Sequence, residues 1–507
     1  MTHNTIQKSR FCYIRKLFHP KLFLLSLLAF NLPNLFADTP NILITSSVLQ
    51  SSQTSPLNVF KDDLDDEFDD MEAELEASFM QLDANLEAQF NALQEAIQKA
   101  FDTQTKKIEV VWPGDVVVPN GTVWVAYSES LSERITYDFE QGYYEIEVKK
   151  DGDTVKNLIR LQEFASKLEE NNASSLQEMD VFGQAIKQEV AKIEPEVASI
   201  AEQNETTRPP QAAKVRPTKQ NTDNASKYAD FSTFTPKANY NAMVTVAPVL
   251  VNTKVDSLID ALVEKQAAPA LTTSDIIAET NTGINTVNKP IIEEANTFSE
   301  ETLAQVMKLE ETETSWSIKV PFVNNYQQRL IDERMPVIND MSEKYGVDVS
   351  LILAIIEAES SFNPMATSHI PAFGLMQLVP KTAGIDAYNH IYGYKKVLTP
   401  EYLYDVDNNL ELGTAYIDVL QSRYLRGIDN EQNKLYSIIA SYNTGVGNLA
   451  NTVTGKKRIR QAIREINEYA PDDYFNYLQQ NLPAVETKNY LTKVLSKREK
   501  YQHLDGT

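Results

Sequence analysis

Hydrophobic residues recur with helical spacing in the first part of the chain. They follow repeated steps of 4, 4 and 3 residues, at Phe60, Leu64, Phe68, Met71, Leu75, Phe79, Leu82, Leu86, Phe90, Leu93, Ile97 and Phe101. An 11-residue period, about 3.67 residues per turn, keeps these side chains in one stripe on a helix. The pattern therefore predicts a long amphipathic helix over 57–103, whose stripe packs on the next domain or on a partner protein along residues 60–101. Its polar face is strongly acidic over 62–76, which argues against binding to an anionic membrane surface.

The following segments alternate between strand and helix patterns. Strands are predicted at 108–112, 122–127, 134–139, 143–148 and 315–320, and helices at 153–170 and 175–193. Gly142 lies between two of these strands, where a hairpin turn favours a positive φ. Residues 194–240 are rich in Pro, Thr, Asn, Gln and Lys, which indicates a flexible insertion. Together these patterns predict an α+β accessory domain over 57–322.

The last part of the chain has almost entirely helical patterns. The predicted helices are 328–345, 348–361, 377–384, 408–426, 433–442, 457–467, 471–480 and 486–500. They predict a compact all-α domain over 326–502.

The N-terminal 37 residues have the pattern of a secretory leader. They contain basic residues and no acid, then an apolar run at 22–32, and then Ala37, after which cleavage is expected. The run is short for a membrane span, although an uncleaved leader would still anchor the chain, and a buried core helix is a third reading. Residues 38–56 are then a tether. This pattern predicts a periplasmic protein.

Composition excludes several classes of protein. The 507 residues include 47 basic and 71 acidic side chains, a net charge of −24, which argues against nucleic-acid binding. Cys12 is the only cysteine, so an intrachain disulfide or a cysteine zinc site cannot form. The five histidines are scattered without metal-ligand spacing. We therefore predict no metal and no cofactor.

Two carboxylates end the most hydrophobic helix pattern. This segment begins with Asp348, a helix-capping residue type, and stops before Asn363-Pro364. Glu357 and Glu359 are two residues apart, about 200° around a helix, so they are expected to point to opposite sides. A carboxyl at the inner end of such a helix has a raised pKa and is usable as a general acid, although a solvated surface role is the simpler alternative.

The motifs around Glu359 resemble a known family. They are Glu359-Ser360-Ser361-Phe362-Asn363-Pro364, Gly374-Leu375-Met376-Gln377, Ser441-Tyr442-Asn443-Thr444-Gly445-Val446-Gly447 and Glu486-Thr487-Lys488-Asn489-Tyr490. In this order they are similar to the soluble-type lytic transglycosylases, which have a lysozyme-like fold. Segments near Trp124, Arg134, Asn409 and Arg423 resemble the membrane-bound lytic murein transglycosylase C branch. The resemblance covers roughly 84–193 and 241–502.

The resemblance implies an exotransglycosylase, a lyase acting on peptidoglycan glycan strands, although the residues leave exo or endo cleavage open. Such enzymes cleave the β-1,4 bond between N-acetylmuramic acid and N-acetylglucosamine without water, and form a 1,6-anhydro ring. One carboxyl acts as acid and then as base, unlike the carboxylate pairs of most glycosidases. By motif position, Glu359 takes this catalytic role.

The resemblance also implies a set of substrate-binding residues. They are Ser360, Ser368, Met376, Gln377, Tyr442, Asn443, Glu486 and Tyr490. Ser368 and Gln377 match positions that hold the sugar or the catalytic carboxyl, Tyr442 places a phenol near Glu359, and Met376 lines the groove. Helix packing or capping is the alternative role for each of the eight.

The chain departs from the family at two points. It has no cysteine after the leader to carry a lipid anchor, and one motif begins with Ser441 where alanine is usual. Two other functions remain open. One is a muramidase that hydrolyses the same bond with a positioned water, and the other is a non-catalytic peptidoglycan-binding scaffold.

Overall fold

The computed structural model describes residues 56–206, 237–247, 308–368 and 371–506. The predicted leader 1–37, nearly all of the tether 38–56 and residues 207–236 of the predicted insertion lie outside these ranges. Within them, no helix is both long and apolar enough to cross a membrane. The chain divides into two compact units, residues 1–74 and 75–507, and the second unit contains both the sheet and the C-terminal helices.

Helix α3 (Pro56–Val111) confirms the long helix predicted from the hydrophobic stripe, but it continues beyond residue 103. The stripe is buried at Leu86, Phe90, Leu93, Ile97 and Phe101, whereas Phe79 is 49% exposed. The strand predicted at 108–112 is wrong. Ile108 and Trp112 are fully buried and Val110 is 81% exposed, because the burial continues the helical period up to the end of α3.

An antiparallel five-stranded sheet forms the β part, in the order β1-β2-β3-β5-β4. Its strands are β1 (Val123–Tyr127), β2 (Glu133–Asp138), β3 (Tyr143–Lys149), β4 (Lys308–Glu311) and β5 (Ser315–Pro321). Four of these confirm predicted strands, and Gly142 does adopt a positive φ of 74° at the β2–β3 turn. Strand β5, about 170 residues later in the chain, thus pairs with β3 of the β2–β3 hairpin, where Ile146 lies opposite Ile318.

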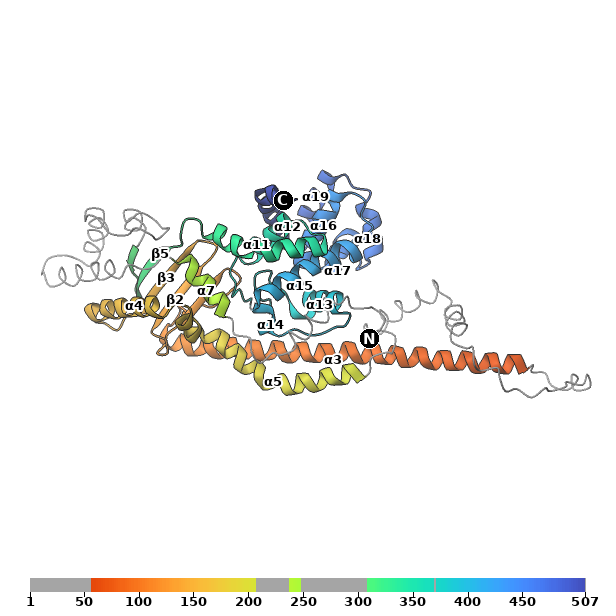
Figure 1. The fold of residues 1–507 in the computed structure, drawn as a ribbon, viewed down its shortest axis with the longest axis horizontal. Coiled ribbons are helices and arrows are strands. Elements are labelled where there is room, and N and C mark those ends of the chain that lie inside the picture. The colour runs from red at the N-terminus through yellow and green to blue at the C-terminus, as the bar shows by residue number, and fades with distance from the viewer. Residues whose placement is uncertain (1–55, 207–236, 248–307, 369–370, 507) are drawn as a thin grey trace, which may run out of the picture. The chain divides into compact units, whose positions relative to one another are not determined.

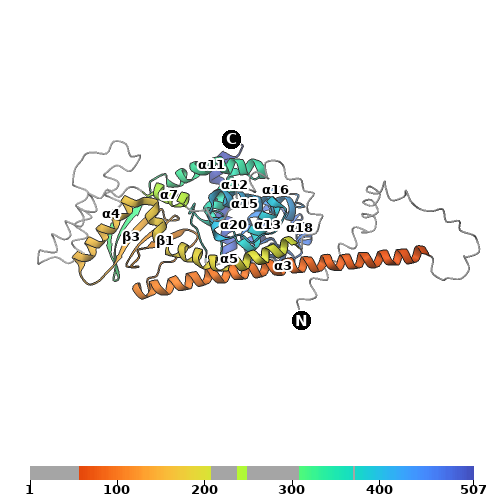
Figure 2. The same ribbon diagram turned by 60° about the horizontal axis from the view of Figure 1, so that its bottom comes forward.

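Two long helices and one short helix belong to this part of the chain (Figures 1 and 2), of which the first packs on the sheet, the second contacts β1 and the short one packs on the first. They are α4 (Thr154–Met179), α5 (Val181–Thr206) and α7 (Lys237–Val246). The break predicted near 171–174 is wrong, because α4 runs on to Met179 and the chain turns at Asp180, whose carboxylate accepts from the Gly183 N–H. The flexible insertion predicted from residue 194 is also wrong at both ends, where α5 and α7 are helical.

The C-terminal part is helical, as predicted. The helices that overlap predicted ones are α11 (Tyr326–Tyr345), α12 (Val349–Glu359), α15 (Val406–Asp418), α16 (Glu431–Thr444), α18 (Ile459–Ile466), α19 (Pro471–Asn481) and α20 (Val485–Tyr501). The sequence patterns missed three further helices, α13 (Ile385–Tyr392), α14 (Pro400–Tyr404) and α17 (Val446–Thr454). Helix α12 is buried from Val349 to Ala358 and packs against α20.

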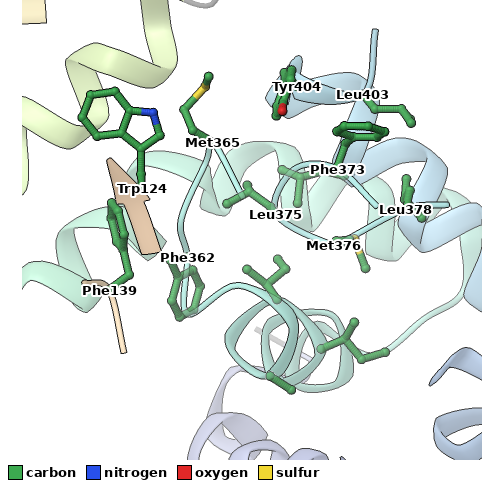
Figure 3. Packing of buried hydrophobic residues seen from close by; sticks show 14 of the residues in the cluster. Trp124, Phe139, Phe362, Met365, Phe373, Leu375, Met376, Leu378, Leu403 and Tyr404 are labelled. Carbon is green, nitrogen blue, oxygen red and sulfur yellow. The ribbon is translucent and has the colours of Figure 1, made fainter. Parts of the chain in front are cut away.

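The sheet and the helical part share one hydrophobic core. Figure 3 shows Trp124 of β1 and Phe139, which directly follows β2, in the same packed core as Phe362 and Met365 of the loop after α12. All four side chains are nearly or fully buried. The loop that follows α12 is therefore packed against the sheet, which brings the β part close to the last residue of α12.

Candidate active site

Glu359 is the last residue of α12. Its carboxyl is enclosed by other side chains, although the residue as a whole is partly exposed to solvent. Its Oε1 accepts a hydrogen bond of 2.7 Å from the Tyr490 hydroxyl. Desolvation raises the pKa of Glu359 to about 7, against the opposing effects of the Tyr490 bond and the Lys493 charge. Near neutral pH this carboxyl can therefore both give and take a proton.

Glu357, two residues earlier, has different surroundings, as the helical spacing predicts. It accepts hydrogen bonds from Lys497 at 2.7 Å, Lys500 at 3.2 Å and Tyr501 at 2.5 Å. Burial by itself would raise its pKa, but the bonds from Lys497 and Tyr501 hold that pKa below the ordinary value. Glu357 is only 6% exposed, so it is not a solvated surface group. Its ion pairs keep Glu357 ionised, whereas Glu359 is the carboxyl of the two that can hold a proton near neutral pH.

Two phenols lie close to Glu359. Tyr490 of α20 binds its carboxyl, and Tyr442 of α16 donates to the Met376 carbonyl at 2.9 Å. Burial raises the pKa of both phenols, and the Glu359 charge adds to that rise in each case. Both hydroxyls therefore stay neutral donors at physiological pH. Helices α12, α16 and α20 each contribute one side chain to this cluster.

The chain turns sharply directly after Glu359. Asp348 does begin α12 as predicted, although its carboxylate binds Arg498 instead of capping the helix. The helix ends at Glu359. Ser361 and Phe362, two and three residues later, have φ values of 50° and 67°. Left-handed backbone costs non-glycine residues about 1–2 kcal/mol each. Strain of this kind persists where the surroundings hold the chain in place.

A second tight turn carries Gln377. Gly374 has φ 74° and Gln377 has φ 45°, and the Gln377 side chain donates to the Gly374 carbonyl at 3.1 Å. Asn409 holds this turn, since it accepts from the Met376 N–H at 2.8 Å and donates to the Phe373 carbonyl at 2.9 Å. A Cβ atom on Gly374 would lie 2.4 Å from the Asn409 amide nitrogen. Only glycine fits there.

The predicted site residues divide into two groups in the structure. Glu359, Tyr442 and Tyr490 form the cluster, and Glu486 is exposed in the first turn of α20, where its charge acts on Glu359. Asn443 is linked to α20 because its Oδ1 accepts from Thr487 at 2.8 Å.

The remaining predicted residues have structural contacts. Met376 is fully buried and packs on Gly413, where a Cβ atom would lie 2.1 Å from its sulfur, so it lines no surface in this structure. The Ser360 hydroxyl is buried and donates to the Leu375 carbonyl at 2.8 Å. The Ser368 N–H binds the Ala372 carbonyl, beside residues 369–370, which lie outside the described ranges.

The sequence patterns missed Lys493 and Gly121 near Glu359, and they gave Asn363 only as part of the motif at which the helix stops. Lys493 donates to the Ala358 carbonyl at 3.0 Å, and Asn363 donates to the Gly121 carbonyl at 3.2 Å. Lys493 is three residues after Tyr490, one turn along α20, so helical spacing could have suggested it. Gly121 is more than 200 residues from Glu359 and no local pattern marks it. In the described part of the chain, no three His, Cys, Asp or Glu side chains gather as a metal site would need.

Comparison with known proteins adds family information. A family model for the transglycosylase SLT domain matches residues 336–464. The membrane-bound lytic murein transglycosylase C of Yersinia enterocolitica serotype O:8 is 41% identical over 187 residues, which are 37% of this chain and 51% of that protein. The protein of the same name from Haemophilus influenzae (strain PittEE) is 34% identical over 220 residues, 43% of this chain and 61% of that one.

The chain thus spans about half to three fifths of the length of these curated relatives. Among solved structures, the 70-kDa soluble lytic transglycosylase in complex with bulgecin A is similar over 57% of this chain and 34% of that chain, with 16% identity and a TM-score of 0.28. A likeness this weak supports no statement about function.

Proposed function

The chain carries a transglycosylase SLT domain at residues 336–464, and from this we propose that it is a lytic murein transglycosylase. It would cleave the β-1,4 bond between N-acetylmuramic acid and N-acetylglucosamine in peptidoglycan and form 1,6-anhydromuramic products. The single observation that supports this most is the Glu359 carboxyl, buried at the end of α12 with a pKa raised to about 7. At that pKa, one group can perform both proton transfers of the reaction.

The proposed reaction needs no water. Protonated Glu359 gives its proton to the glycosidic oxygen as the bond to C1 of the muramic residue breaks. The resulting carboxylate, stabilised by the Tyr490 hydroxyl, then takes the proton from the C6 hydroxyl, whose oxygen bonds to C1. The carboxyl returns to its first state, and the two products together have the atoms of the substrate.

The surroundings of Glu359 favour this single-carboxyl reaction over ordinary hydrolysis with two carboxylates. Most glycosidases place a second carboxylate about 5–9.5 Å from the first, where it acts as nucleophile or activates water. The adjacent Glu357 is tied to Lys497 and Lys500. Glu486 is exposed at the start of α20. Of the eight other predicted residues, Gln377, Tyr442, Asn443, Glu486 and Tyr490 are the ones we propose to contact substrate or the catalytic carboxyl.

Product analysis tests the proposal. Purified peptidoglycan is digested with the wild-type chain and with Glu359→Gln, and the muropeptides are weighed by mass spectrometry. We expect products lighter by one water than hydrolysis products, and a loss of at least about 10²–10⁴-fold in rate for the variant. Products with reducing ends would indicate a muramidase. Binding to the cell wall without any product from wild type would indicate a scaffold.

The cellular setting is also part of the proposal. The leader pattern at 1–37 and the peptidoglycan substrate support a periplasmic protein of a Gram-negative envelope, attached to a membrane if the leader is not cut. The exposed Phe79 of α3 supports a protein partner for the acidic helix over 60–101. The mass of the mature chain from fractionated cells would show whether the leader is removed, and crosslinking from position 79 would capture the partner.

A further inference from the structure

A short loop before β1 reaches the turn that follows Glu359. In this loop, residues 119–122, the Asn120 carbonyl accepts from the Thr367 N–H at 3.3 Å, and the Gly121 carbonyl accepts from the Asn363 side chain at 3.2 Å. The Asn120 side chain shapes the loop, since its Oδ1 accepts from the N–H groups of Thr122 and Val123 at 2.9 and 2.8 Å. The sheet part is therefore bonded directly to the loop that follows α12.

Gly121 approaches Glu359 more closely than any other residue type could. A Cβ atom added to Gly121 would lie 2.9 Å from the backbone oxygen of Glu359 and 3.8 Å from the Gln377 Oε1. Real Cβ atoms essentially never come within 3.0 Å of another atom, so a side chain here would displace backbone. No positive φ accounts for this glycine. Glycine is therefore needed at this position because a side chain would clash with the backbone of Glu359.

The turn that this loop contacts is strained. Ser361 and Phe362 are consecutive left-handed residues that are not glycine, and such a pair is held only where its surroundings determine it. The holding contacts come from the sheet part. Phe362 is fully buried in the core cluster that also contains Phe139 (Figure 3), and the Gly121 carbonyl accepts a hydrogen bond from the fully buried Asn363.

Helix α7 supplies further hydrogen bonds to the loop that follows Glu359 and to the Tyr404 carbonyl. The Asn239 side chain donates to the Tyr404 carbonyl at 2.8 Å and to the Pro364 carbonyl at 3.3 Å. Asn239 is almost fully buried, so these bonds are made away from water, where an unmade partner is costly. Two separate segments of the accessory region thus fix the strained loop after Glu359.

We propose that the 119–122 loop is a positioning element for Glu359, with Gly121 and its partner Asn363 as positioning residues. The inference rests on the proposed function for its activity readout. Through its close contact with the backbone of Glu359, the loop sets where α12 ends and how its carboxyl faces Tyr490. Displacements of about 1 Å at a reacting group can cost about 100-fold in rate. The SLT domain would thus depend on the sheet for full turnover.

Two substitutions in the full chain test this role from both sides of the contact. Gly121→Ala adds the Cβ that meets the Glu359 carbonyl. Asn363→Ala removes the bond to the Gly121 carbonyl and the bond that Asn363 Oδ1 accepts from the Met365 N–H at 3.0 Å. The matched control is Asn467→Ala, which removes a bond of 2.9 Å to the Gly427 carbonyl, a bond of 3.0 Å accepted from the Asp429 N–H and one of 3.0 Å to the Asp429 carboxylate. This control contact lies in the same helical part and touches none of the site residues.

For both test variants we expect kcat to fall about tenfold or more with KM within twofold of wild type. We also expect the pH at which activity declines on the alkaline side to move by half a unit or more, because the enclosure of the Glu359 carboxyl changes. The Asn467→Ala control should keep both values. A merely structural contact would lower the melting temperature and leave the pH profile unchanged, and that result overturns the proposal.

A readout without activity separates this inference from the proposed function. Glutamate labelled with carbon-13 allows the carboxyl titration of Glu359 to be followed by NMR and assigned by its loss in Glu359→Gln. A shifted titration in Gly121→Ala supports positioning even if wild type forms no anhydro product, in which case only the proposed function fails. An unshifted titration and unchanged kcat in folded Gly121→Ala refute positioning even if wild type is an active transglycosylase.

Discussion

Replacing Tyr490 by phenylalanine should move the pH dependence of the reaction in the alkaline direction. The substitution removes the 2.7 Å hydrogen bond from the Tyr490 hydroxyl to Glu359 and keeps the ring. That bond favours the ionised carboxylate and lowers the Glu359 pKa, against the larger effect of burial. Without it, the pKa should rise further above about 7, so the protonated form persists to higher pH.

The size of this effect follows from the energy of the bond. A hydrogen bond to a charged group contributes about 1.5–3 kcal/mol, and 1.36 kcal/mol corresponds to one pKa unit. The expected rise is about one pKa unit, the lower end of this range. At pH 8, roughly a tenth of wild-type Glu359 and roughly half of it in the variant would be protonated, so the ratio of activity at pH 8 to activity at pH 5 should be about fivefold higher in Tyr490→Phe.

At pH 5 Glu359 is protonated in both the wild type and the variant, so their rates differ only because the variant no longer stabilises the carboxylate that forms during the reaction. There we expect kcat to fall about tenfold, the rate equivalent of about 1.4 kcal/mol. The assay is anhydromuropeptide release from purified peptidoglycan between pH 4 and pH 9.

The matched control is Tyr501→Phe. It removes a hydroxyl from the same helix α20, but that hydroxyl binds Glu357 instead of Glu359. We expect this variant to be less stable and to keep the wild-type pH profile. An alkaline limb that stays in place in Tyr490→Phe, or that moves equally in Tyr501→Phe, would refute the role given to Tyr490.

Two further predictions concern stability. The Glu359 pKa is about 7 in the folded chain against an ordinary value of 4.5. Above pH 7 the buried group is ionised and lowers the free energy of unfolding by at most about 3 kcal/mol. This destabilisation decreases as the pH falls from 7 to 4.5. Glu359→Gln should therefore gain stability over wild type at pH 8 and not at pH 4, measured by urea unfolding; an equal difference at both pH values would contradict the pKa assignment. Asn409→Ala should lose about 2–4 kcal/mol of unfolding free energy, because the buried Phe373 and Leu403 carbonyls lose their donor, and a loss below about 1 kcal/mol in the same assay would show that the turn holds itself.

The sequence predicted those features that depend on local periodicity. The stripe of α3, the β2–β3 hairpin at Gly142 and the divergence of Glu357 from Glu359 follow from spacing along one element, and the structure has all three. The strand predicted at 108–112 shows the limit of such patterns. A short run with β-branched residues fits either period, and the exposure of Val110 between the buried Ile108 and Trp112 fits the helix and not a strand.

The site was predictable only in part, because its residues meet through tertiary packing. The family resemblance placed Tyr442 near Glu359 but gave Tyr490 only as a substrate-binding residue of the cleft, whereas in the structure both phenols lie at Glu359. The same resemblance placed Met376 in a groove, whereas its side chain is fully buried against Gly413. The contact between Gly121 and Glu359 joins two distant segments, and one glycine in a loop carries no local signal of it.

Digestion of peptidoglycan in heavy-oxygen water tests the central claim most directly. A transglycosylase closes the ring with the substrate's own C6 oxygen, so we predict that the new muramic ends carry no heavy oxygen and that Glu359→Gln forms none of these ends. Incorporation of one heavy oxygen at each new end would contradict the account, because it would show that water attacks C1 and that Glu359 serves a hydrolase.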